Sequence, residues 1–217
     1  AKTGVGVPEL MDAVADFGLE PGELVRHAHS ATGEDHTVTA TDEAPFVAQV
    51  FKTKIDPYVS KLSFIRILSG KLTKDTVVRD ARSGRGIKIH QLLDVQGGQV
   101  QQVDEAHAGD LVAVAKIDDF QVGDTLFSSQ DNSDWSLPLM EFPTPIIGLA
   151  VEPKSRDDQP KIATALHRIE EEDPTFKLVR DPQTHEMVMQ GMSDLHLKIV
   201  QERMKSRDKV DVLTHEP

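Results

Sequence analysis

The chain has 217 residues, no cysteine, 24 lysines and arginines and 36 aspartates and glutamates, for a formal net charge of −12. With 38% hydrophobic residues it can form a core, and its length suggests one large or two small domains. The absence of cysteine excludes disulfides, thiolate zinc sites, iron–sulfur clusters and a cysteine nucleophile. The longest apolar stretch, 146–151, is too short for a membrane span, and no signal sequence opens the chain, so we expect a cytoplasmic protein.

The charge is unevenly distributed along the chain. Residues 52–88 carry 10 basic and 3 acidic side chains, whereas residues 1–51 carry 2 and 9 and residues 89–144 carry 1 and 10. A basic block between acidic ones is typical of a protein with one surface that faces phosphates. Basic side chains that protect exposed strand edges would give the same pattern, so charge alone leaves both interpretations open.

The first part of the chain predicts a helix, a linker and a β domain. In residues 8–17, Leu10, Val14 and Phe17 recur at helical spacing, which predicts a short amphipathic helix. Residues 20–43 are polar and have no sustained period, so we expect a linker. Between residues 46 and 127, short β-branched runs alternate with turn residues, which indicates an antiparallel barrel or sandwich. The predicted strands are 46–51, 62–68, 76–78, 87–93 and 111–117.

After a boundary near residues 131–145, strands alternate with helices. The predicted strands are 146–152, 176–180, 186–189 and 210–212, and the predicted helices are 158–172 and a segment that is capped by Ser193 and carries Leu195, Ile199 and Met204. This order is the βαββαβ order of ferredoxin-like domains. The predicted fold class is therefore a β-barrel domain followed by an α+β ferredoxin-like domain.

The residues needed for nucleotide or metal chemistry do not occur in the right patterns. A phosphate-binding loop ends in Gly-Lys-Ser/Thr, but Gly70-Lys71 is followed by Leu72. His27 and His29 share a face if they lie on a strand, yet spacing fixes no carboxylate partner for them. We therefore predict no metal site and no catalytic residue in this chain.

Two other classes of function remain open from the residues alone. The first strand–helix loop of the ferredoxin-like domain contains Lys154 and Arg156, which could hold an anion as in a stand-alone acylphosphatase-like enzyme. The acidic residues in that loop and its lack of glycine count against this enzyme. A structural module that uses its acidic surfaces is the other alternative. The strands lack the aromatic platform of an RNA-recognition motif.

Longer motifs resemble bacterial elongation factor G and related translational GTPases. Those that resemble its second domain are Asp56-Pro57-Tyr58-Val59-Ser60-Lys61-Leu62, Ala108-Gly109-Asp110-Leu111 and Gly123-Asp124-Thr125-Leu126. Those that resemble its third domain are Met140-Glu141-Phe142-Pro143, Glu152-Pro153-Lys154-Ser155, Glu171-Glu172-Asp173-Pro174 and Gly191-Met192-Ser193-Asp194-Leu195-His196. Ala1 and Lys2 resemble the tail of the last guanine-contacting motif.

The resemblance implies a domain plan. Residues 1–19 are then the C-terminal helix remnant of a GTPase domain, 20–43 a linker, 44–137 β-barrel domain II and 138–217 ferredoxin-like domain III. GTP and magnesium belong to the family's G domain, so we expect no cofactor in this fragment and no GTP hydrolysis by the fragment alone.

The resemblance also implies partners. In this family, domain II docks on small-subunit ribosomal RNA, and domain III relays between the nucleotide switches and the ribosome. GTP hydrolysis is thereby coupled to translocation of tRNA and mRNA. We expect a monomer that binds the ribosome through small-subunit rRNA and a ribosomal protein, acts on tRNA and mRNA indirectly, and contacts its own G domain and no membrane.

The candidate site residues follow from the basic block and the resembling motifs. As contacts to RNA phosphates we predict Lys61, Arg66, Arg85 and Lys88. As switch or ribosome contacts we predict Lys154, Arg156, Gly191, Met192, Ser193, Asp194 and His196.

Some positions depart from the family pattern. Ser60 replaces a common Gly, Thr144 a common Glu, and Ser193-Asp194 a Gly-Glu pair. His185 replaces a turn glycine, which predicts a left-handed backbone there. These departures keep open a paralogue that acts in ribosome recycling, ribosome protection or peptide release.

Overall fold

The computed structural model describes residues 2–56, 60–130, 136–155 and 158–217. The chain forms two compact units. The first unit comprises residues 1–49, 65–112 and 125–138, and the second comprises residues 50–64, 113–124 and 139–217. The predicted boundary between barrel and ferredoxin-like domain falls partly on residues 131–135, outside the described residues.

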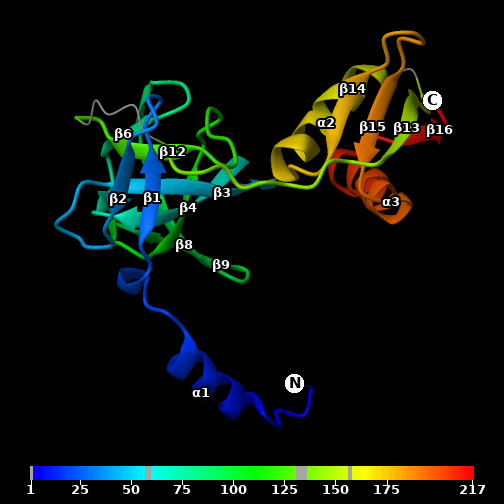
Figure 1. The fold of residues 1–217 in the computed structure, drawn as a ribbon. Coiled ribbons are helices and arrows are strands. Elements are labelled where there is room, and N and C mark those ends of the chain that lie inside the picture. The colour runs from blue at the N-terminus through cyan, green and yellow to red at the C-terminus, as the bar shows by residue number, and fades with distance from the viewer. Residues whose placement is uncertain (1, 57–59, 131–135, 156–157) are drawn as a thin grey trace. The chain divides into compact units, whose positions relative to one another are not determined.

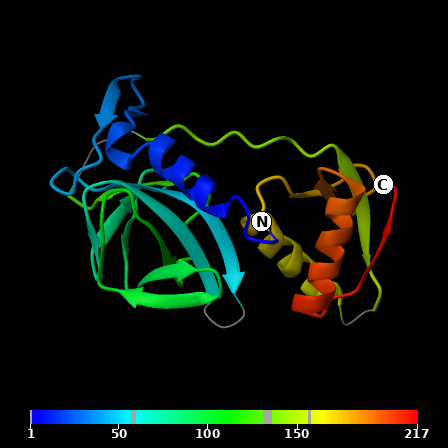
Figure 2. The ribbon, with the colours of Figure 1, turned by 90° about the horizontal axis from the view of Figure 1, so that it is seen from below.

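The predicted barrel is an eight-stranded antiparallel sheet with the order β7-β6-β12-β3-β4-β11-β8-β9. Figure 2 shows these strands curving into a barrel. Its strands are β3 (Val47–Asp56), β4 (Ser60–Ser69), β6 (Val77–Asp80), β7 (Gly86–Lys88), β8 (Leu92–Gln96), β9 (Gln99–Val103), β11 (Leu111–Ala115) and β12 (Thr125–Ser128). A separate two-stranded sheet joins β5 (Leu72–Thr73) to β10 (Glu105–Ala106).

One predicted strand is divided in the structure. Instead of a single strand over 87–93, β7 ends at Lys88 and β8 begins at Leu92. Ile89 is fully buried, and its backbone exchanges hydrogen bonds with the segment before β6, because its amide donates to Thr76 and its carbonyl accepts from Asp75. The chain therefore leaves one strand partner for another at this point, which the run of apolar residues does not reveal.

The predicted linker contains a short 3₁₀ helix, η1 (Pro21–Glu23), and a β-hairpin made of β1 (Arg26–His29) and β2 (Asp35–Val38) (Figure 1). Ala28 and Val38 pack with Val47, Leu68 and Phe127 in one apolar cluster. Segment 20–43, predicted as a linker, thus contains regular secondary structure and packs as part of the first unit. Only two of the eight strand residues are buried, so the sequence carries little apolar periodicity.

The amino-terminal helix, α1 (Val7–Phe17), begins with Pro8 in its first turn, as the sequence predicts. None of its residues is buried. Leu10, Val14 and Phe17 are 61, 58 and 84% exposed, so the apolar face that the spacing predicts has no partner within the described residues.

The carboxy-terminal part has the predicted βαββαβ order. It consists of β13 (Ile147–Pro153), α2 (Gln159–Glu172), β14 (Lys177–Arg180), β15 (Met187–Gly191), α3 (Asp194–Arg203), the π-helix η2 (Met204–Asp208) and β16 (Val212–His215). The strands form an antiparallel sheet in the order β14-β15-β13-β16, and both helices contact it (Figure 1). His185, in the turn between β14 and β15, has φ 60°, which confirms the predicted left-handed backbone.

The core of this domain lies between the helices and one face of the sheet. Ile162, Leu166 and Ile169 of α2 are buried in it, as the spacing predicts. In α3 the buried residues are Leu197 and Val200, followed by Met204 in η2. Leu195 and Ile199 of α3, by contrast, are 66 and 41% exposed.

The acidic residues at the end of α2 interact unfavourably with the helix dipole, but an arginine of the same domain forms an ion pair with one of them. Glu172 Oε2 lies 2.7 Å from Arg207 Nη1, and Asp208 Oδ2 lies 3.1 Å from Arg207 Nε. Burial alone would lower the pKa of Arg207, but its hydrogen bonds and ion pairs with Glu172 and Asp208 raise it.

Among the described helices, none is long and apolar enough to cross a membrane.

The packing of α2 predicts a measurable dependence on one side chain. Because Leu166 is fully buried in the core, Leu166→Ala should lower the free energy of unfolding by about 2–5 kcal/mol through lost burial and the cavity that remains. Urea unfolding followed by circular dichroism measures this change. The control is Leu195→Ala, which should stay within about 0.5 kcal/mol of the parent chain. Equal losses for both variants would contradict the described core.

Candidate nucleic-acid interface

The last part of the basic block forms the hairpin of β6 and β7. Arg79 pairs with Gly86 and Val77 with Lys88 across the two strands. Arg82, Arg85 and Lys88 are exposed. The connection between the strands thus presents several cations on a short, hydrogen-bonded segment of the barrel.

A buried carboxylate holds this connection in place. Asp80, the last residue of β6, is 0% exposed. Its side-chain oxygens accept hydrogen bonds from the backbone amides of Arg82 (3.2 Å) and Ser83 (3.0 Å) and from the Ser83 hydroxyl (2.6 Å). Its backbone amide donates to the Arg85 carbonyl at 3.0 Å. Asp80 therefore fixes the backbone between Arg82 and Arg85.

Lys88 is exposed and forms an ion pair at the other end of the hairpin. Its Nζ lies 3.0 Å from Asp75 Oδ1, and roughly half of each side chain is exposed. The hydrogen bond from Lys88, followed by its positive charge, lowers the pKa of Asp75. Such an exposed pair is weak, because water screens it, so the ammonium can exchange the carboxylate for a phosphate.

A second cationic group in the first unit joins two residues that are distant in sequence. Arg26 of β1 and Arg66 of β4 are both half-buried and line the same small pocket. Burial, and next the charge of Arg66, lower the pKa of Arg26. The Nε of Arg66 is buried and has no hydrogen-bond partner in the structure. Two like charges with an unmet donor form a favourable place for an anion.

Lys61 has a different environment from the other three predicted phosphate contacts. Lys61 is only 4% exposed, and its Nζ donates a hydrogen bond to the backbone carbonyl of Asp118 at 2.8 Å. The ammonium is thus turned into the protein, where a phosphate would have to displace an existing bond. We therefore leave Lys61 out of the exposed cationic surface.

The predicted contact segment of the ferredoxin-like domain is a rigid turn at the start of α3. Ser193 caps the helix by accepting from the amide of His196 at 3.1 Å. His196 Nδ1 accepts from the amide of Met192 at 3.2 Å, and its Nε2 lies 3.1 Å from Asp173. A Cβ on Gly191 would lie 2.7 Å from Leu197 Cδ2 and 3.0 Å from His196 Nδ1, so a larger residue there would require these side chains to shift. Ser193, Asp194 and Leu195 are the exposed residues of this turn.

The remaining predicted residues do not join these groups. Lys154 is exposed, and its Nζ lies 2.9 Å from Asp211. Lys2 lies in an exposed turn before α1. Ala1 and Arg156 lie outside the described residues. Arg26 is not among the predicted contacts, because it lies in the predicted linker, and no pattern relates it to Arg66 forty positions later.

Comparison with known proteins identifies both domains. Residues 45–129 match the family model of elongation factor G domain 2, and residues 142–216 match that of elongation factor G domain III. Elongation factor G of Mycoplasma pneumoniae and that of Mycoplasma genitalium are each 38% identical to the chain over 208 residues. Each alignment covers 95% of this chain but 30% of the relative, so the chain spans about a third of their length.

A solved structure shows the same arrangement of the backbone. A crystal structure of a protein from Thermus thermophilus is similar with a TM-score of 0.79 and 26% sequence identity. The alignment covers 98% of this chain and 29% of that one. The barrel followed by a ferredoxin-like domain, which the sequence predicts, is therefore confirmed.

The Asp80 contacts generate a prediction about the hairpin. Asp80→Ala removes the acceptor of two backbone amides and one hydroxyl, so it should lower the free energy of unfolding by about 2–3 kcal/mol. Amide hydrogen exchange should also accelerate at Arg82 and Ser83. The control Asp94→Ala changes an exposed carboxylate of the same barrel and should leave both quantities near their parent values. Unchanged exchange at Ser83 in Asp80→Ala would contradict this role.

Proposed function

Because the chain carries domain 2 and domain III of the elongation factor G family, and so belongs to that family, we propose that it is the ribosome-binding part of a translational GTPase. The relatives it resembles are about three times as long, and in our proposal the nucleotide site lies in a G domain outside this chain. Domains 2 and III then couple GTP hydrolysis on the ribosome to movement of tRNA and mRNA.

The observation that carries this proposal is the β6–β7 hairpin. Its cations lie on a segment whose backbone is fixed by the buried Asp80 carboxylate, so they meet a partner without an added cost of ordering the loop. Lysine and arginine side chains of this kind contact phosphate oxygens and position a protein on RNA without reading bases. We assign Arg85 and Lys88 to the phosphates of small-subunit ribosomal RNA.

Arg26 and Arg66 supply a second phosphate contact in the proposal. A guanidinium presents a planar set of donors that matches two phosphate oxygens. A bound phosphate would relieve the repulsion between the two arginines, and it could accept from the Nε of Arg66, which the protein leaves without a partner. This contact uses Arg66 as the sequence predicts and adds Arg26 to it.

Two further surfaces fit the remaining partners of a multidomain GTPase. The apolar face of α1, with Leu10, Val14 and Phe17 exposed, suits packing against the G domain of the same protein. The turn from Gly191 to His196 is held by hydrogen bonds and exposes Ser193, Asp194 and Leu195, which suits a contact with the nucleotide switches or with a ribosomal protein.

Ribosome binding tests the proposal most simply when measured against salt. We expect the double variant Arg85→Glu with Lys88→Glu to bind purified ribosomes more weakly than the parent chain in sedimentation assays. The slope of log K against log salt is negative, and each lost phosphate contact should reduce its magnitude by about one. For this variant the magnitude should therefore fall by about two.

A control variant separates this contact from general charge. Lys161→Glu with Lys205→Glu changes the net charge by the same amount on exposed residues of the ferredoxin-like domain. It should keep the parent slope. Equal losses of affinity and slope in both variants would contradict a specific contact at the hairpin, and binding that is independent of salt would contradict phosphate recognition altogether.

A further inference from the structure

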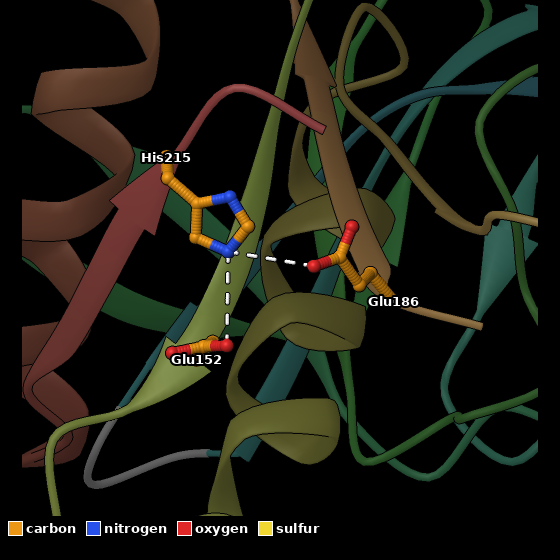
Figure 3. Close-up of side chains that lie close together, drawn as sticks. All are labelled: Glu152, Glu186 and His215. Atoms are coloured by element: carbon orange, nitrogen blue, oxygen red, sulfur yellow. Dashed lines mark ion pairs between the residues drawn. The ribbon is translucent and has the colours of Figure 1, made fainter. Parts of the chain in front are cut away.

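Three side chains from three adjacent strands meet on the ferredoxin-like sheet. Glu152 lies near the end of β13, Glu186 directly before β15 and His215 at the end of β16. Because Val151 pairs with Met187 and Ala150 with His215, the sheet register brings the three residues to one face. Figure 3 shows one nitrogen of the imidazole directed at both carboxylates.

This face of the sheet is the one that the helices leave uncovered. Side chains along β13 point alternately to the two faces of the sheet. Leu149 and Val151 pack into the core beneath α2 and α3. Glu152 therefore points to the opposite side. The side chains of Glu152, Glu186 and His215 are 59, 29 and 43% exposed, so an ion and its water ligands can reach them.

The tautomer of His215 leaves its ligating nitrogen directed at the carboxylates. His215 Nδ1 lies 2.8 Å from the backbone carbonyl of Glu216, which can only accept, so Nδ1 carries a hydrogen. In the neutral ring, Nε2 then offers a lone pair. Histidines that bind metals usually donate the other N–H to a carbonyl or carboxylate in this way, because that bond fixes the ring's orientation.

The distances from His215 Nε2 to the two carboxylates are longer than those of charge-assisted hydrogen bonds. His215 Nε2 lies 3.5 Å from Glu186 Oε1 and 3.7 Å from Glu152 Oε1. A charge-assisted N–H···O bond is about 2.7–2.9 Å long. Zinc bonds of about 2.0–2.1 Å, by contrast, place neighbouring ligands of a tetrahedral site about 3.3–3.4 Å apart. All three ligand atoms lie within 4.8 Å of one another.

We propose that Glu152, Glu186 and His215 bind a divalent zinc ion, with water as the fourth ligand. One nitrogen and two carboxylate oxygens suit Zn²⁺, whereas Mg²⁺ and Ca²⁺ prefer oxygen ligands throughout. The ion would fill the space among three facing lone pairs and would tie β16 to β13 and β15. This site is independent of the ribosome contacts, since it lies in residues that the proposed function does not use.

The experiment is a titration of the 217-residue chain with Zn²⁺, read by the side-chain nitrogen resonances of its histidines. We expect Nε2 of His215 to shift with one equivalent of Zn²⁺ while Nδ1 keeps its hydrogen. In calorimetry, His215→Gln and Glu186→Gln should each weaken the binding that accompanies this shift at least tenfold. Excess Mg²⁺ should not compete.

A matched control is His167→Gln, because His167 is also exposed and its Nδ1 lies 3.3 Å from the carboxylate of Glu170. It should bind Zn²⁺ like the parent chain. Zn²⁺ should also raise the melting temperature of the parent and of His167→Gln but not of His215→Gln. The proposal is overturned if the His215 resonance does not shift, or if Glu186→Gln binds as tightly as the parent chain.

Discussion

The buried carboxylate of Asp80 is the constraint on which the proposed RNA contact depends. It ends β6 inside the barrel and accepts from the backbone of the turn that follows, so the exposed cations stand on a fixed backbone. Leaving such a group without partners in the interior would be costly, which explains why the turn adopts the shape that satisfies it. A fold requirement and a binding surface are thus joined in one short hairpin.

The central strand β13 has a comparable role in the ferredoxin-like domain. One side of it packs beneath the helices, and the other carries Glu152 toward Glu186 and His215. The strict alternation of a strand allows the same seven residues to build the core and to hold the proposed ion. The face of the sheet opposite the helices is therefore as specific in its chemistry as the packed one.

Much of the fold could be predicted from the sequence because its periods are clear. The strands of the barrel and the βαββαβ order follow from alternation and from helical spacing, and the left-handed His185 follows from its position in a turn. The hairpin formed by β1 and β2 was missed, since Ala28 and Val38 are its only buried strand residues. The exposure of Leu195 was also missed, because an apolar residue gives no sign of which face the core covers.

The candidate sites were less predictable, for a different physical reason. Arg85 and Lys88 could be named because a hairpin keeps them close in sequence as well as in space. Arg26 and Arg66 lie on strands of two different sheets, and the two glutamates meet His215 through strand pairing; spacing encodes neither arrangement. The ammonium of Lys61 likewise donates to the backbone carbonyl of Asp118, more than fifty positions away, and the sequence does not show this contact.

The most direct test of the central claim is electron cryomicroscopy of the 217-residue chain bound to ribosomes. We expect Arg85 and Lys88 to lie within about 3–4 Å of phosphate oxygens of small-subunit ribosomal RNA. A complex in which the β6–β7 hairpin faces solvent, while another part of the chain contacts the RNA, would contradict it.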